Sequence, residues 1–93
     1  MSQVINETLS ADGSTAVYQA KTNDTVIAVC TGTFGSGTIT AEVSGDNTNW
    51  VAAGADSTIT EAGSFKVEIK KDMYYRLTLS GSTSPSIKCI AFE

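Results

Sequence analysis

The chain has 93 residues, with 10 acidic residues against 6 basic ones and a formal net charge of −4. This length suits a single domain with a thin stability margin, and the scattered basic residues do not form the stripe that nucleic-acid binding requires. The sequence contains no histidine, which excludes Ser-His-Asp and Cys-His catalysis, most zinc sites and the usual general base near neutral pH.

Short strands are expected throughout the N-terminal half. Residues 1–8 are predicted to form an N-terminal arm or an edge strand, ahead of a single β-sandwich domain over residues 9–93. A turn at residues 11–13 separates this segment from strands predicted at 16–20 and 26–34. A second turn, with glycine at both ends, then leads into the middle of the chain.

The middle segment carries the clearest pattern in the sequence. Ile39, Ala41 and Val43 alternate with polar residues, which is the period of a strand with one buried face. The strand runs into residues 45–47, whose Gly, Asp and Asn tolerate the left-handed backbone of a tight turn. Trp50, the only tryptophan, follows and is predicted to open the next strand as a large core anchor.

The C-terminal half continues as short alternating segments. Its expected strands lie at residues 50–53, 58–60, 65–70, 73–80 and 87–92. No window has the i, i+3, i+4, i+7 spacing of an amphipathic helix. The sequence therefore predicts an all-β protein, an antiparallel β-sandwich (immunoglobulin-like or jelly-roll-like) of about eight short strands.

Cys30 and Cys89 lie in separate predicted strands. A disulfide between strands, or an immunoglobulin-like pin beside Trp50, is one interpretation. The other is a pair of small buried hydrophobic residues that stay reduced. Immunoglobulin domains have a tyrosine two residues before the second cysteine, where this chain has Ile87, so buried, reduced and structural cysteines are favoured.

The acidic residues do not form a catalytic or metal-binding pattern. Glu42 and Glu68 could approach each other across neighbouring strands, but acids on outer strand faces are usually solvated. The cluster of Asp46, Asn47 and Asn49 lacks the ligand spacing and terminal Glu of an EF-hand, and turn formation explains it better. We therefore expect a protein that is not an enzyme and that uses no metal or other cofactor.

Adjacent tyrosines indicate that part of the aromatic surface leaves the core. Tyr74 and Tyr75 point to opposite faces of a strand. If Tyr75 enters the core, Tyr74 and Arg76 point outwards. They then form either part of a partner contact or an ordinary half-exposed cross-strand pair.

The two ends of the chain supply further candidate contacts. Apolar residues occupy both faces of the last predicted strand, which indicates that Ile90 and Phe92 are covered by a neighbouring sheet or another subunit. Val4 and Ile5 are the apolar residues of the N-terminal segment and would anchor an arm to a neighbour.

The placed strands and turns carry a resemblance. A glycine-flanked turn after Phe34 leads to a strand ending in Glu42-Val43-Ser44, and then to a turn and Trp50; Tyr75-Arg76-Leu77-Thr78-Leu79-Ser80-Gly81 and a closing strand follow. Over roughly residues 33–92 this resembles small β-sandwich virion proteins of tailed bacteriophages. An S-x-D-G-x-x-W-like turn and a Y-x-R-x-x-x-S-G-like strand recur in those proteins, and this chain has Asn47 where the turn has Gly.

This resemblance implies a structural virion protein. It implies above all a capsid decoration (cement) protein that binds the outside of a phage head and clamps subunits of the major capsid protein, often as a homotrimer. The chain carries no long loops, helices or coiled coils of the kind that tail and fibre proteins add, which favours that role over a tail or neck adaptor. A visible signal peptide and a membrane-spanning run are lacking, so we expect synthesis in the host cytoplasm, a final place on the capsid surface and no membrane contact.

A glycan-binding β-sandwich module is the alternative from another functional class. A turn followed by tryptophan also occurs in carbohydrate-binding domains, where Trp50 or Tyr74 would stack against a sugar. The position of the indole separates the two interpretations. An indole beside a polar groove favours glycan binding, and a fully buried one removes the best candidate residue.

Overall fold

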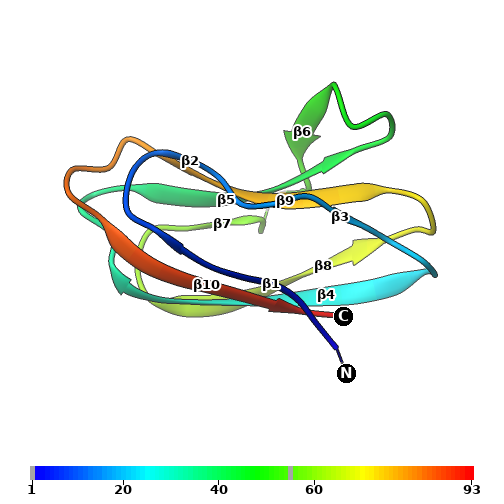
Figure 1. Ribbon diagram of the computed structural model, residues 1–93, viewed down its shortest axis with the longest axis horizontal. Coiled ribbons are helices and arrows are strands. Elements are labelled where there is room, and N and C mark those ends of the chain that lie inside the picture. The colour runs from blue at the N-terminus through cyan, green and yellow to red at the C-terminus, as the bar shows by residue number, and fades with distance from the viewer. Residues whose placement is uncertain (1, 55) are drawn as a thin grey trace.

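Residues 2–54 and 56–93 are described by the computed structural model, and their regular structure consists entirely of strands. Ten strands form two antiparallel sheets that pack against each other (Figure 1). The all-β antiparallel fold predicted from the sequence is therefore confirmed, with more and shorter strands than expected.

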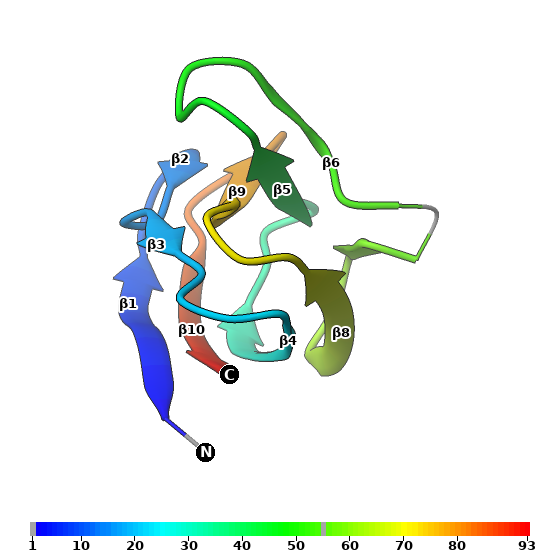
Figure 2. The ribbon, with the colours of Figure 1, turned by 90° about the vertical axis from the view of Figure 1, so that its right-hand side faces the viewer.

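Sheet A has four strands, which lie in the order β1 (Gln3–Leu9), β10 (Ser86–Phe92), β4 (Asp24–Thr33) and β8 (Gly63–Ile69). The main path of sheet B runs through β2 (Gly13–Ser14), β9 (Tyr74–Ser80), β5 (Thr38–Ser44) and β6 (Trp50–Ala52). Two further short strands extend sheet B, β3 (Tyr18–Gln19) beside β9 and β7 (Thr58–Ile59) beside β5. Figure 2 shows the two layers end-on, with β1 and β8 at opposite edges of sheet A.

The core lies between the sheets because alternation along each strand turns every second side chain inwards. Its almost fully buried side chains are Ile39 and Ala41 of β5, Tyr75, Leu77 and Leu79 of β9, Val26, Ala28 and Cys30 of β4, and Ile87, Cys89 and Ala91 of β10. Tyr75 is the largest of them. Each buried Leu or Ile contributes about 1.5–3 kcal/mol, so this interior accounts for most of the favourable free energy of folding.

Residues 3–9 form an edge strand of sheet A, one of the two alternatives that the sequence left open for residues 1–8. Strand β1 pairs with β10 from Gln3–Phe92 to Leu9–Ile87, and Met1 lies outside the described residues. Ile5 is only 4% exposed and Val4 packs against the core. The prediction that Ile5 anchors an arm to a neighbour is therefore wrong, because its side chain is buried in this chain. Val4 also packs against the core but is partly exposed, so its contact with a neighbour stays a prediction.

The prediction that Trp50 is a core anchor is also wrong. Trp50 pairs with Ser44 in the register of β5 and β6, and this register turns its side chain to the outer face of sheet B. The next residue, Val51, points the other way and is 64% exposed. Strand β6 projects away from the rest of the sandwich (Figure 1), so sheet A does not cover its inner side.

A close approach of two loops explains one of the glycine-rich turns. Gly35 has a φ of 59°, and a Cβ at this position would collide with the carbonyl oxygen of Thr83. The backbone N–H of Thr83 donates to the carbonyl oxygen of Gly35 at 2.8 Å. The turn between β4 and β5 is thereby fastened to the loop between β9 and β10, which closes one end of the sandwich.

Candidate functional site: the two outer faces of the sandwich

The outer face of sheet B, called the B face below, carries a row of aromatic and polar side chains. The strand register aligns Tyr74 on β9, Ser44 on β5 and Trp50 on β6. The next row aligns Arg76 with Glu42. Glu42, Tyr74 and Arg76 alternate with core residues along β5 and β9, so their side chains lie on the outer side of the sheet. Trp50 shares this side through its pairing with Ser44, which is itself only 4% exposed.

A chain of polar contacts connects the side chains of the B face. The Oε1 atom of Glu42 accepts hydrogen bonds from Nε of Arg76 at 2.9 Å and from Oγ1 of Thr78 at 2.6 Å. Thr78 Oγ1 lies 2.8 Å from Oγ of Ser14. The guanidinium carbon of Arg76 lies 4.1 Å from the centre of the Trp50 ring, in the geometry of a cation–π contact. Thr78 therefore holds the Glu42 end of the charged pair, and the Trp50 ring holds the Arg76 end.

The loop that precedes Trp50 is fastened by its own hydrogen bonds. The Asp46 carboxylate accepts from the backbone N–H of Asn49 at 2.8 Å and of Thr48 at 2.9 Å, and the Ser44 hydroxyl donates to it at 3.0 Å. These bonds, the backbone one from Asn49 first, hold the pKa of Asp46 well below its usual range. Asn47 has the left-handed backbone of a turn, with a φ of 61°. The cluster of Asp46, Asn47 and Asn49 thus forms a turn, as the sequence predicted.

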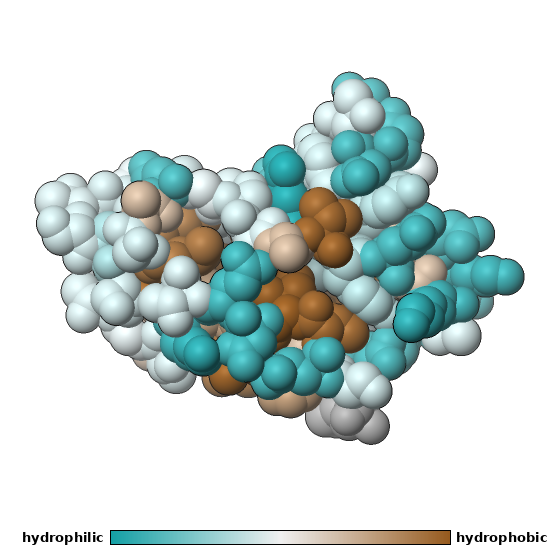
Figure 3. Space-filling model, in the orientation of Figure 1, coloured by the Kyte–Doolittle hydropathy of each residue, from teal (hydrophilic) through white to brown (hydrophobic). Residues whose placement is uncertain are grey.

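The B face is not flat, because the loop between β5 and β6 and strand β6 project from it. In Figure 1 the loop after β5 and strand β6 rise from sheet B, on the side away from sheet A, while β5 itself lies within the sheet. Figure 3 shows a step in the molecular surface at the foot of this projection. Trp50 begins β6 and so stands where the hairpin meets the flat part of the sheet.

The outer face of sheet A, called the A face below, has a different character. Ile27 and Val29 of β4 lie directly opposite Phe92 and Ile90 of β10. We call these four side chains the apolar block. Each is partly exposed and none packs against the core. Among the described residues there is no third layer over sheet A, so the apolar block faces solvent.

Polar residues surround the apolar block, and among them the Asn6 side-chain amide donates to Oε1 of Gln3 at 3.3 Å. Across the strand register, Gln3 and Lys66 flank the row of Phe92 and Ile27, and Asn6 and Ser64 flank the row of Ile90 and Val29. Lys88 lies one row further along β10, opposite Thr31. Lys66, Lys88 and Glu68 all lie on this face, Glu68 opposite Thr25 and one row from Lys66, so the face carries charges of both signs.

Comparisons of the chain with protein-family models, with curated protein sequences and with solved structures find no match. The two faces are therefore the features from which a function can be argued.

The six predicted contact residues fall into three places. Tyr74 and Arg76 lie on the B face, Ile90 and Phe92 lie on the A face, and Val4 and Ile5 pack against the core or within it. The prediction that Tyr75 points inwards and Tyr74 outwards is confirmed, since Tyr75 has no exposed surface.

The sequence reasoning missed residues on both faces. On the A face these are Ile27 and Val29, although the unbroken apolar run from Val26 to Cys30 carried the same two-sided signal as the last strand. On the B face they are Thr78 and Ser14, which no sequence pattern singles out because only strand pairing brings them together.

The two cysteines face each other in the interior. Cys30 of β4 and Cys89 of β10 are directly opposite in the register, and both are free thiols with no exposed surface. The prediction that both are buried is confirmed. A hydrogen bond with the Cys89 thiol, together with burial, raises the pKa of Cys30, so its thiol stays neutral and unreactive.

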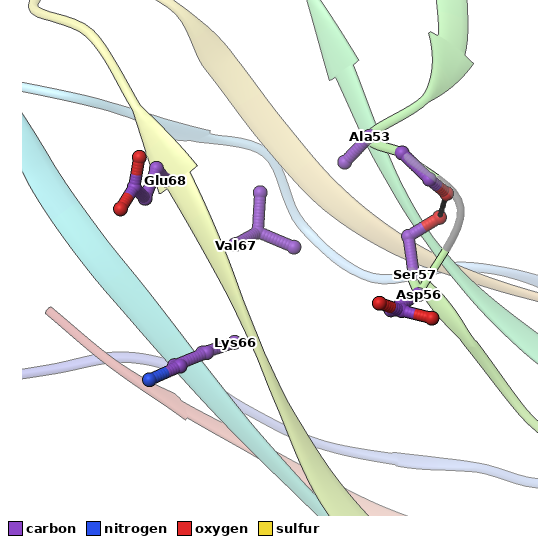
Figure 4. A pocket seen from close by; sticks show the side chains of 7 residues that line it. Ala53, Asp56, Ser57, Lys66, Val67 and Glu68 are labelled. Carbon is purple, nitrogen blue, oxygen red and sulfur yellow. Dashed lines mark hydrogen bonds between the residues drawn. The ribbon is translucent and has the colours of Figure 1, made fainter.

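A hollow of about 290 Å³ lies at the side of the sandwich, between β8 and the segment that connects β6 to β7. Figure 4 shows Val67 pointing towards Ala53 and Ser57, while Lys66 and Glu68 point to the other side of β8. The Ser57 hydroxyl already donates to the carbonyl oxygen of Gly54 at 2.6 Å. The lining is therefore mixed, with Ala53 and Val67 beside the polar residues Asp56 and Ser57, and the Lys66 and Glu68 side chains point away from it.

Within residues 2–54 and 56–93, no three His, Cys, Asp or Glu side chains come close enough together to hold a metal ion. Those residues also contain no helix whose length and apolar character would allow it to cross a membrane.

Proposed function

We propose that this chain is a non-enzymatic structural protein of a virion that decorates the outside of a phage head and clamps subunits of the major capsid protein. The apolar block of the A face is the observation that carries this proposal. An apolar cluster on the outer face of a two-layered sandwich is unfavourable in water and typical of a surface that another protein covers.

Each contact between the A face and the capsid should be weak, so the stabilising effect should come from many copies acting together. Full burial of an Ile, Val or Phe side chain contributes about 1.5–3 kcal/mol, and the side chains of the apolar block are already partly covered. The remaining gain is offset in part by the lost freedom of the two partners. Many copies on one shell each bury surface across a joint between subunits, and together they would oppose internal pressure.

The charges around the apolar block indicate the chemistry of the partner surface. Lys66 and Lys88 flank it, and Glu68 lies one row beyond Lys66 on β8. An apolar partner surface with carboxylates at its rim fits this arrangement, because rim charges of opposite sign steer and orient an encounter. We propose that the major capsid protein presents such a surface, and that neither nucleic acid nor a membrane is a partner.

We also propose that the protein acts as a homotrimer, with the outer edge of β1 as the subunit contact. Strand β1 ends sheet A, so its outer edge has backbone groups without a strand partner. Figure 3 shows apolar surface alongside this edge. Contacts at the edge would leave the A face free to lie on the shell.

The test uses heads assembled without this protein. A double variant, Ile90→Ser with Phe92→Ser, should remain folded and lose most of its binding to these heads. Val51→Ser is the matched control, because it makes the same kind of change at an exposed apolar residue away from the A face. Undiminished decoration by the folded double variant would refute the proposal.

Copy number separates the head from the alternative sites. Gel densitometry of purified virions should show many copies of the chain for each head. A count that matches the few copies of a neck or tail ring would instead identify a tail or neck adaptor that uses the same A face.

A further inference from the structure

The only tryptophan of the chain lies outside its core. Trp50 is partly exposed on the B face and does not pack against the core cluster. An indole stabilises a small domain most when it is buried, so folding does not account for this placement. Exposed tryptophan beside polar side chains is suited to stacking against a ligand that is apolar on one face and polar at its rim.

Hydrogen-bonding groups beside the indole retain free capacity. Glu42 uses Oε1 for both of its contacts, and Arg76 donates to it through Nε. Over residues 2–54 and 56–93, the Oε2 atom of Glu42 and the two Nη groups of Arg76 have no hydrogen-bond partner. A carboxylate oxygen that accepts and a guanidinium that donates, side by side, match two adjacent hydroxyl groups, since each hydroxyl both donates and accepts.

These groups are arranged before any ligand arrives. The contacts of Arg76 with Glu42 and with the Trp50 ring hold both charged side chains, and Thr78 holds Glu42 from the other side. The Asp46 hydrogen bonds hold the loop that leads to Trp50. Binding would therefore order few side chains, which lowers its entropic cost.

Shape and charge narrow the class of ligand. Strand β6 and the loop before it project from sheet B (Figure 1), and Trp50 begins β6 with the polar side chains of Arg76 and Glu42 beside it. Glu42 and Arg76 neutralise each other, and the net charge of −4 disfavours anionic ligands. A neutral ligand with a flat apolar face and adjacent hydroxyl groups fits best, and a hexose ring has these properties.

We propose that the B face is a binding site for neutral oligosaccharides. The Trp50 indole stacks against one sugar ring, on the side away from Arg76, while Glu42 Oε2 and the Arg76 Nη groups bind adjacent hydroxyls of the same chain of sugars. Tyr74, two strands away in the same row, contacts the next sugar. This site goes beyond the proposed role on the capsid, because the B face is turned away from the A face and stays open when the A face is docked.

The single tryptophan makes the site testable in the free protein. Emission of Trp50 is followed while glucose-, galactose-, mannose- and N-acetylglucosamine-terminated oligosaccharides are added, each beside its sialylated counterpart. At least one neutral oligosaccharide should change the emission saturably at high micromolar to millimolar concentration. The sialylated counterpart should bind more weakly.

Matched variants assign the binding to the B face. Glu42→Gln should weaken binding about tenfold, as expected for a lost charged hydrogen bond, whereas Glu68→Gln, the same change on the A face, should leave it unaltered. Trp50→Phe, followed by calorimetry and checked for folding by circular dichroism, should bind less tightly than the parent chain.

Three results would overturn this proposal. One is the absence of saturable binding to every neutral oligosaccharide at millimolar concentration. Another is oligosaccharide binding that Glu42→Gln and Trp50→Phe leave intact, which would place the site elsewhere. The third is loss of head decoration in these variants without any sugar binding by the parent, which would make the B face a protein contact.

Discussion

The A face and the B face are the two outer sides of one sandwich, and they expose different kinds of side chains to solvent. The A face leaves an apolar block of Ile27, Val29, Ile90 and Phe92 partly exposed within a border of polar residues. The B face places the Trp50 indole against Arg76, whose ion pair with Glu42 is itself supported by a hydrogen bond from Thr78. The core requires neither arrangement, so each points to a partner, an apolar protein surface for the A face and a hydroxyl-rich ligand for the B face.

Removal of residues 1–8 should have the largest effect, because it takes away most of the strand that borders the A face. The loss of Ile5 alone should lower the free energy of unfolding by about 2–5 kcal/mol, and unpaired β10 adds to this. Chemical denaturation of the truncated and full-length chains measures the difference. An equally stable truncated chain would show that β1 is a dispensable arm.

Reciprocal variants should separate the two faces. Ile27→Ser on the A face should weaken head binding by about 2 kcal/mol, roughly 30-fold, as for an interface anchor, and leave oligosaccharide binding unchanged. Thr78→Ala on the B face removes a hydroxyl that holds Glu42 and should have the opposite pattern. If either variant affects both activities equally while the fold is intact, the faces are not independent.

Substitutions in the core, between the two faces, should lower the stability of the fold and leave binding at both faces unchanged. Cys30→Ser or Cys89→Ser buries a hydroxyl at a site with no exposed surface, which should cost about 1–2 kcal/mol of stability. Head binding and oligosaccharide binding should persist below the lowered melting temperature. Intact mass before and after reduction should be identical, and a gain of two hydrogens on reduction would show a disulfide instead of free thiols.

The smallest effect should come from the loop that supports Trp50. The pKa of Asp46 is lowered from its ordinary value of 3.8 by hydrogen bonds to the ionised carboxylate. Its contribution to loop order is therefore complete above about pH 4 and is lost as the pH falls towards the depressed pKa. Trp50 emission should change over this acidic range in the parent chain and not in Asp46→Asn. A carboxyl resonance of Asp46 that titrates at its ordinary pKa would contradict the loop geometry.

Local pattern determined a large part of the fold. The period-two alternation in the segments of β5, β8 and β9 needs only the pleat of a strand, so the inward side of Tyr75 and the outward side of Arg76 followed from the sequence. The turn formed by residues 45–49 followed in the same way, because its Asp and Asn side chains bond to nearby backbone groups.

Properties that depend on register and pairing were decided only by the tertiary structure. In β6 both Trp50 and Val51 are apolar, so the alternation is ambiguous, and the pairing of Trp50 with Ser44 turned the indole outwards. The same holds for the apolar block and for the contact of Cys30 with Cys89, since each joins β4 to β10 from distant parts of the chain. Side chains from distant strands meet only when the strand order of the sheet is established, and that order depends on how the whole core packs.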